Sequence, residues 1–323
     1  MSKNSTRLLL SVLFICAAAV GYLRMYSYSP PQSEHLIYES SAESENECTS
    51  YEKYDTESKT CYYACKDESE CAQIETEIEN ELASWTDDYS AKKHSDEKPD
   101  VNQDEFVKAS YTVSNTEKIT LAKGADDDEY RTIWDRISQL SPNNISDRYI
   151  SEYQVFDNPE DDTQAFVDDP DGDGRWRIAV NLSGYRVSDP KERSATLIHE
   201  LGHIITLNTS QVVPGADQCH TYAIDEGCSK ADSYLYLFVS RFWKNEPQPV
   251  YDPTKFVTEY AATSDVEDLA ESFAFYVLEK TASGTAVKDQ KLTFFAAHPD
   301  LVSIRAQMRK VLTKDIIRAR KGK

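Results

Sequence analysis

The segment from Leu197 to Ile205, with the sequence Leu-Ile-His-Glu-Leu-Gly-His-Ile-Ile, constrains this chain more than any other part of it. Its two histidines, His199 and His203, are four residues apart, so an α-helix would project both imidazoles from one face toward a single Zn²⁺ ion. Glu200 lies beside them, where its carboxylate could take a proton from a water molecule at the metal. The segment therefore predicts a helix that carries two ligands and the general base of a hydrolytic zinc site.

The residues that precede this segment contain the signals of a helix start. Asp189 is a suitable N-cap, Pro190 would occupy the first helical position, and Glu192 would be the acid of a capping box. Apolar residues then continue through Leu207. We expect a buried helix over this stretch.

Two histidines leave a zinc ion one protein ligand short of the usual catalytic set. The extended motif with a glycine three residues and a histidine six residues after the second histidine is absent, because Thr206 and Thr209 stand at those positions. The remaining source is a glutamate on a later helix, and Glu267 and Glu271 are one helical turn apart. The alternatives are that Glu267 serves as a capping-box acid for Ser264 and that Glu271 is a solvated surface acid.

The sequence Glu-x-x-Ala-Glu-x-Phe, which begins at Glu267, resembles the second helix of the gluzincins, the thermolysin-like zinc peptidases, and this region is similar to the catalytic domain of anthrax lethal factor. The resemblance implies that Glu267 is the third zinc ligand and that Glu271 orients a ligand histidine. It also implies that the phenol of Tyr260 stabilises an oxyanion. The similarity extends at most over residues 176–277, and it departs from thermolysin in having Glu rather than Asp at position 271.

Two of these assignments have structural alternatives. Tyr260 is one of 20 tyrosines, so only its spacing from Glu267 favours a catalytic role. His220, which lies between Cys219 and Cys228, could donate to a substrate, but a structural role near a disulfide is the alternative.

These residues together predict a peptidase with one Zn²⁺ per chain, in which Glu200 acts as the general base toward a metal-activated water and Tyr260 assists at the oxyanion. Two other functions are compatible with the same site. One is an extracellular adaptor that keeps the metal without cleaving anything. The other is an amidase that acts on cell-wall peptides. The net charge of −21 without a basic face argues against nucleic acid as a partner, and we expect a monomer.

The N-terminus has the composition of an export signal. Lys3 and Arg7 precede an apolar run over residues 8–23, which at about sixteen residues is short for a spanning helix. We expect residues 1–24 to be a signal peptide or a signal anchor. The protein would then be secreted, periplasmic, or held at the outer face of the membrane by residues 8–23.

Cysteine usage also favours an oxidising compartment. Apart from Cys16 the chain has an even set of six cysteines: Cys48, Cys61, Cys65, Cys71, Cys219 and Cys228. We expect one disulfide between the last two and two disulfides among the first four, in any of three connectivities, with a four-thiolate zinc site as the alternative. Residues 25–104 thus form an acidic, disulfide-stapled segment and linker, and whether this segment is a propeptide stays open.

A regular pattern begins at about residue 105 and predicts an α+β fold for residues 105–323. It is zincin-like, with a small mixed or antiparallel sheet packed on the active-site helix and a mostly helical C-terminal half. We expect strands at 106–113 and 118–121 and antiparallel strands at 148–156, 163–167 and 175–182. Helices are expected at 126–140, 190–207, 232–243, 264–279 and 299–319.

Residues 176–181 are our candidate for an edge strand, by the zincin resemblance, and a peptide substrate would pair with them as an added strand. The Asp- and Gly-rich turn before this strand resembles a calcium loop. Its twelfth position is Val180 instead of an acid, so we favour a hairpin turn over a calcium site.

Overall fold

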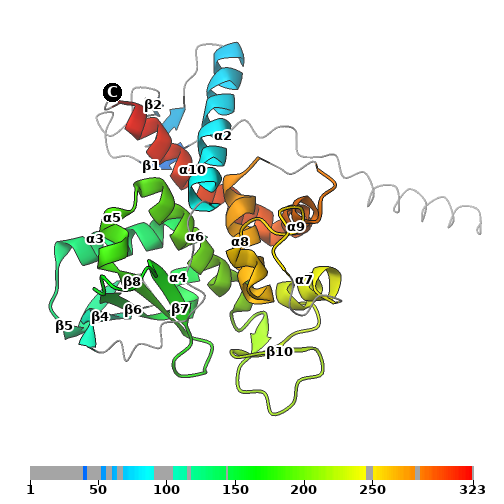
Figure 1. Ribbon diagram of the computed structural model, residues 1–323. Helices are drawn as coiled ribbons and strands as arrows, with labels where there is room; N and C mark the ends of the chain where they lie inside the picture. Colours follow the sequence, from blue (N-terminus) through cyan, green and yellow to red (C-terminus); the bar gives the residue numbers. More distant parts are fainter. Residues whose placement is uncertain are drawn as a thin grey trace, which may run out of the picture. The chain divides into compact units, whose positions relative to one another are not determined.

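The computed structural model describes residues 39–41, 52–55, 60–63, 68–90, 105–114, 118–142, 145–244, 250–280 and 284–321 (Figure 1). The chain divides into two compact units, one made of residues 1–48 and 52–63 and the other of residues 49–51 and 64–323. Among the described residues no helix is both long enough and apolar enough to cross a bilayer. Residues 1–24 lie outside the described residues, so the export signal stays a prediction.

The smaller unit contains a three-stranded antiparallel sheet with the order β1-β3-β2. Its strands are β1 (Glu39–Ser41), β2 (Glu52–Asp55) and β3 (Thr60–Tyr63). Cys61 in β3 is in register with Ser40 and Tyr54. The side chains of Cys48, Cys61, Cys65 and Cys71 lie outside the described part of the chain, so their pairing remains a prediction.

The larger unit contains a five-stranded mixed sheet with the order β5-β4-β6-β8-β7. Its strands are β4 (Val107–Val113), β5 (Ile119–Gly124), β6 (Ile150–Phe156), β7 (Ala165–Asp168) and β8 (Trp176–Asn181). β6 and β8 are parallel, whereas the other neighbours are antiparallel. As predicted, β7 and β8 form an antiparallel hairpin. β7 pairs on the outer side of β8, so the neighbour of β6 in the sheet is β8, and because the chain reverses twice between these two strands they run parallel.

The same strand order corrects the predicted edge strand. β8 pairs with β6 on one side and with β7 on the other, so its backbone hydrogen-bonding groups are already in use over residues 176–181. A substrate strand has no place there, and the edges of the described sheet are β5 and β7. The turn between β7 and β8 is a hairpin connection, in which the Asp169 carboxylate accepts from the backbone amides of Asp173 and Gly174.

Helices make up most of the rest of the larger unit, which confirms the α+β class. Those around the sheet are α3 (Asp128–Leu140), α4 (Ile145–Tyr149), α5 (Leu182–Val187) and α6 (Pro190–Leu207). The later ones are α7 (Tyr234–Phe242), the 3-10 turn η4 (Tyr260–Ala262), α8 (Asp265–Leu278), α9 (Val287–Ala296) and α10 (Pro299–Lys321). A small sheet joins β9 (Val212–Val213), β10 (Tyr222–Ile224) and β11 (Gly227–Ser229).

Helix α6 is the centre of this unit and begins as its sequence indicates. The Asp189 carboxylate accepts from the backbone amides of Lys191 and Glu192, and Pro190 opens the first turn. The Glu192 side chain accepts from Gln164 instead of closing the capping box. Figure 1 shows α6 between the sheet and α8, and it contacts both β7 and α8.

Helix α2 (Glu68–Ser90) also belongs to the larger unit. It packs against α6, α8 and α10. The contact face consists of residues spaced three or four apart that are almost fully buried: Ile78, Leu82, Trp85 and Tyr89. The other positions of the helix are mostly charged or polar, so the composition of the segment gives little indication of this apolar face.

Candidate metal centre

Helix α6 gathers His199, Glu200 and His203 into one buried cluster, as their spacing predicts. The exposed fractions of the three residues are 4%, 6% and 8%. One ligand atom from each side chain lies within 4.8 Å of those of the other two. Buried imidazoles and carboxylates at this separation could hold a metal ion.

Glu267 of α8 approaches both histidines and completes a triangle of ligand atoms. Its Oε2 lies 3.2 Å from Nε2 of His199 and 3.2 Å from Nε2 of His203, and the two Nε2 atoms are 3.1 Å apart. Three ligands of a tetrahedral ion with bonds of about 2.0–2.1 Å would be about 3.3 Å apart. Oε2 of Glu267 is also buried without a hydrogen-bond partner in the described residues. The spacing of the three atoms therefore matches the spacing of ligands around one tetrahedral metal ion.

A glycine between the two histidines permits this approach of α8 to α6. A Cβ atom on Gly202 would lie 3.1 Å from the ring of Phe273 and 3.4 Å from the carbonyl oxygen of Ala270. A Cβ atom here would require the Phe273 ring to give by a few tenths of an ångström, so Gly202 permits the close packing of α8 on α6 that brings Glu267 to the histidines. At the start of α8, the Ser264 hydroxyl accepts from the backbone amide of Glu267. The cap therefore uses the backbone of Glu267, and its carboxylate faces the histidines.

Glu271 lies one turn further along α8 and is fully buried. One of its oxygens, Oε1, is 2.7 Å from Nδ1 of His199 and accepts from the Tyr89 hydroxyl at 2.7 Å. The other oxygen, Oε2, accepts from the Thr258 hydroxyl at 2.6 Å. A carboxylate at Nδ1 favours the tautomer that carries its proton there, which leaves the lone pair of Nε2 for a metal. Glu271 is thus not a solvated surface acid.

Tyr260 lies in η4, with its ring centroid 5.9 Å from that of His199. Burial, together with the charges of Glu267, Glu200 and Glu271 and a hydrogen bond to Glu267, raises the pKa of Tyr260 well above its usual value. Its phenol therefore stays protonated at neutral pH and can donate a hydrogen bond beside the cluster.

The carboxylates and imidazoles of the cluster shift one another's pKa values. Burial raises the pKa of Glu200 to about 7 against the opposing effect of the two histidines. Burial alone would lower the pKa of His199, but the adjacent carboxylates of Glu267 and Glu271 raise it well above its usual value. Burial would raise the pKa of Glu267, yet His203 and His199 hold it well below its usual range.

The predicted disulfide between Cys219 and Cys228 is present, with an S–S distance of 2.00 Å. It closes the β10–β11 hairpin, from which the Tyr222 hydroxyl donates to the Asp265 carboxylate at the start of α8. His220 lies exposed in this loop and is not brought into the cluster.

Sequence reasoning missed two members of the site. Neither Tyr89 nor Thr258 was among the predicted residues, although both donate to Glu271. The only signal for Tyr89 is the helical spacing of Ile78, Leu82, Trp85 and Tyr89 within a segment that otherwise reads as acidic and solvated.

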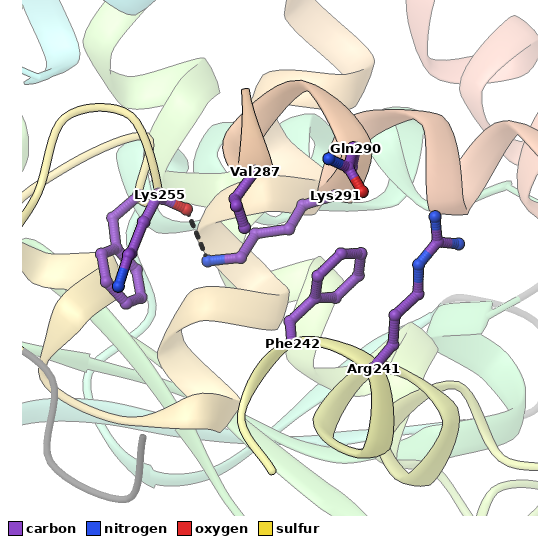
Figure 2. Close-up of a pocket in the computed structure, with 7 residues that line it drawn as sticks. Arg241, Phe242, Lys255, Val287, Gln290 and Lys291 are labelled. Atoms are coloured by element: carbon purple, nitrogen blue, oxygen red, sulfur yellow. Dashed lines mark hydrogen bonds between the residues drawn. The ribbon is translucent and has the colours of Figure 1, made fainter. Parts of the chain in front are cut away.

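A hollow of about 180 Å³ lies elsewhere, beside α7 and α9 (Figure 2). Arg241, Phe242, Lys255, Val287 and Lys291 are among its lining residues, and the lining includes none of the metal-centre residues. Figure 2 shows the Lys291 ammonium group turned toward the backbone of Lys255, whose carbonyl accepts from it at 2.7 Å. The hollow is therefore separate from the cluster.

No protein-family model, curated protein or solved structure matches this chain.

Proposed function

We propose that this protein is a zinc-dependent peptidase of the gluzincin type. The observation that carries the proposal is the triangle of His199, His203 and Glu267 ligand atoms, with sides of 3.1–3.2 Å, beside the buried carboxylate of Glu200. Two imidazole nitrogens and one carboxylate oxygen are the protein ligands of thermolysin-type catalytic zinc, which keep the fourth position open. We expect one zinc ion per chain.

Zinc in this position would supply Lewis-acid chemistry, by lowering the pKa of water and polarising a substrate carbonyl. Glu200 would accept the proton of the attacking water and return it to the amine of the departing peptide. A general base works best when its pKa is close to the working pH, and in the metal-free protein burial shifts the pKa of Glu200 upward in that direction. The protonated phenol of Tyr260 would donate to the oxygen of the carbonyl as negative charge develops on it.

Substrate binding would use β7, the edge strand on the side of the sheet next to α6. β7 pairs with β8 through one side, so its other side can accept an extended peptide by main-chain hydrogen bonds. We further propose that the protein is exported, since the disulfide between Cys219 and Cys228 suits an oxidising compartment.

The test compares the wild-type protein with Glu200→Gln, using bound metal and cleavage of a quenched random-peptide library as readouts. Glu259→Gln is the matched control, because Glu259 is exposed, precedes Tyr260 and makes no side-chain cap. We expect one zinc per chain in all three proteins and cleavage lost only in Glu200→Gln. If Glu200→Gln cleaves as fast as the wild type, the assigned base is wrong.

Other outcomes would select the alternative functions. If all three proteins bind zinc and none cleaves the library, the protein is an adaptor or an amidase restricted to cell-wall peptides. An assay with a cell-wall peptide as substrate then distinguishes the two, because only the amidase would cleave it. A wild-type protein that binds no zinc would refute the proposal.

A further inference from the structure

Helix α2 reaches the metal centre through the side chain of Tyr89. Tyr89 lies in the last turn of α2 and is 1% exposed. Its hydroxyl donates to the carboxylate of Glu271, which is 182 residues away in the sequence. Its ring packs against Phe275 of α8, with centroids 6.5 Å apart. The hydroxyl therefore approaches Glu271 from a fixed direction.

Glu271 depends on such donors for its orientation. Its carboxylate is fully buried, and three separate segments contact it: α2 through Tyr89, the segment before η4 through Thr258, and α6 through His199. Tyr89 and His199 share the same oxygen, Oε1. Without the hydroxyl, the buried Oε1 would lose a donor, and the carboxylate would be held less firmly against the imidazole although Thr258 still donates to its other oxygen.

We propose that Tyr89 is a positioning residue of the metal centre, acting through Glu271 to hold the His199 ring and its tautomer. The inference deepens the proposed function and rests on it, because it treats the cluster as a metal site. It also assigns α2 to the mature enzyme: any cleavage that matures the chain must fall before Glu68.

Independent contacts along α2 support this assignment. Glu81 forms an ion pair with Lys191 of α6 at 2.7 Å. Glu79 pairs with Arg309 of α10, whose Nη1 also donates to the carbonyl of Val277 at the end of α8 at 2.7 Å. Leu82 lies between these anchors and Tyr89 and is fully buried. Removal of α2 would therefore expose an apolar face and leave the buried guanidinium of Arg309 without its carboxylate.

The experiment compares Tyr89→Phe with Tyr153→Phe in the full chain. Tyr153 is an apt control because it is also buried and its hydroxyl also donates one strong bond, to the Tyr130 carbonyl at 3.0 Å, but on the sheet. The first readout is zinc affinity by competition with a chromophoric chelator. The second is the Nδ1 resonance of the His199 imidazole in ¹⁵N spectra of the metal-free protein. The melting temperature of each variant reports its stability.

We expect Tyr89→Phe to weaken zinc binding by up to about tenfold, the lower end of the loss that follows removal of a group contacting a metal-ligating histidine, because Tyr89 acts one step further out, through Glu271. It should also shift the His199 resonance. Tyr153→Phe should lower the melting temperature without either effect. If both variants leave zinc affinity unchanged, or lower it equally, Tyr89 has no positioning role. An active mature form that starts after residue 89 by mass spectrometry would overturn the assignment of α2.

Two results would separate this inference from the proposed function. If the wild type binds no zinc, the proposed function fails, and Tyr89 is then judged by the His199 resonance alone. If Tyr89→Phe does not fold, the wild type decides: a slowly exchanging phenolic proton on Tyr89 supports the bond to Glu271, and a fast-exchanging one refutes it.

Discussion

The buried ion pair between Asp268 and Lys291 offers a quantitative test of how α8 is held in place. The two side chains are 0% and 1% exposed, and Nζ of Lys291 lies 2.6 Å from Oδ2 of Asp268. The same carboxylate accepts from the Trp243 indole at 2.7 Å and from the Ser272 hydroxyl at 3.2 Å. Because Asp268 follows Glu267 directly, this pair fixes the turn of α8 that carries the third candidate ligand.

We expect Lys291→Met to lower the free energy of unfolding by about 3–5 kcal/mol at pH 8, because it leaves the buried Asp268 carboxylate without its cation. Burial already raises the pKa of Asp268 to about 6, with Lys291 acting to lower it. Without Lys291 this pKa would rise further. When the pKa of Asp268 is higher in the folded protein than its unfolded value of about 3.9, its protonation stabilises the fold. That contribution is fully present below pH ~3.9 and is lost as the pH rises through the folded pKa. The deficit of the variant should therefore shrink between pH 8 and pH 5.

The assay is urea unfolding of the metal-free proteins at pH 8 and pH 5. Lys288→Met is the control, since Lys288 lies on the same helix and is partly exposed. Combining Lys291→Met with Asp268→Asn should recover much of the loss, as no buried charge is then left unpaired. A loss below about 1 kcal/mol at pH 8, or an equal loss at both pH values, would contradict the reasoning.

Two further predictions concern the metal centre and the hairpin beside it. Zinc binding should release about one proton from His199 at pH 7, because Glu267 and Glu271 raise the pKa of that imidazole above its usual value and the proton must leave before the metal binds. Zinc affinity should therefore increase with pH. Calorimetry in buffers of different ionisation enthalpy measures the number of protons released, and a value of zero would contradict the prediction. Replacing both Cys219 and Cys228 by alanine should cost about 2–3 kcal/mol, from the loop closed over their separation of 9 residues. Chemical unfolding of the variant and the wild type checks this value, and equal stabilities would show that the bridge constrains nothing.

Local signals were sufficient to predict most elements of the larger unit. The bounds of α6 follow from the cap at Asp189, the proline after it and the apolar residues through Leu207, all of which act within a few residues of the helix. The order of the strands was not predictable in this way. Whether β7 pairs inside or outside β8 depends on contacts across the whole sheet, and the edge position and the parallel pairing both follow from that choice.

The residues of the candidate site also differ in whether a local sequence signal predicts them. His199, Glu200 and His203 lie on one helix, so their spacing alone predicts that they meet. Glu267 sits on another helix, so the sequence offered it only as one candidate for the missing ligand, and the choice between Glu267 and Glu271 came from a family resemblance. Tyr89 had neither kind of signal: it is a tyrosine at the end of an acidic helix, and its partner Glu271 is 182 residues away. Residues that orient a ligand through a distant contact need only the correct position and one donor group. Many sequences satisfy that requirement, so it leaves no motif, and the three-dimensional arrangement is needed to find such residues.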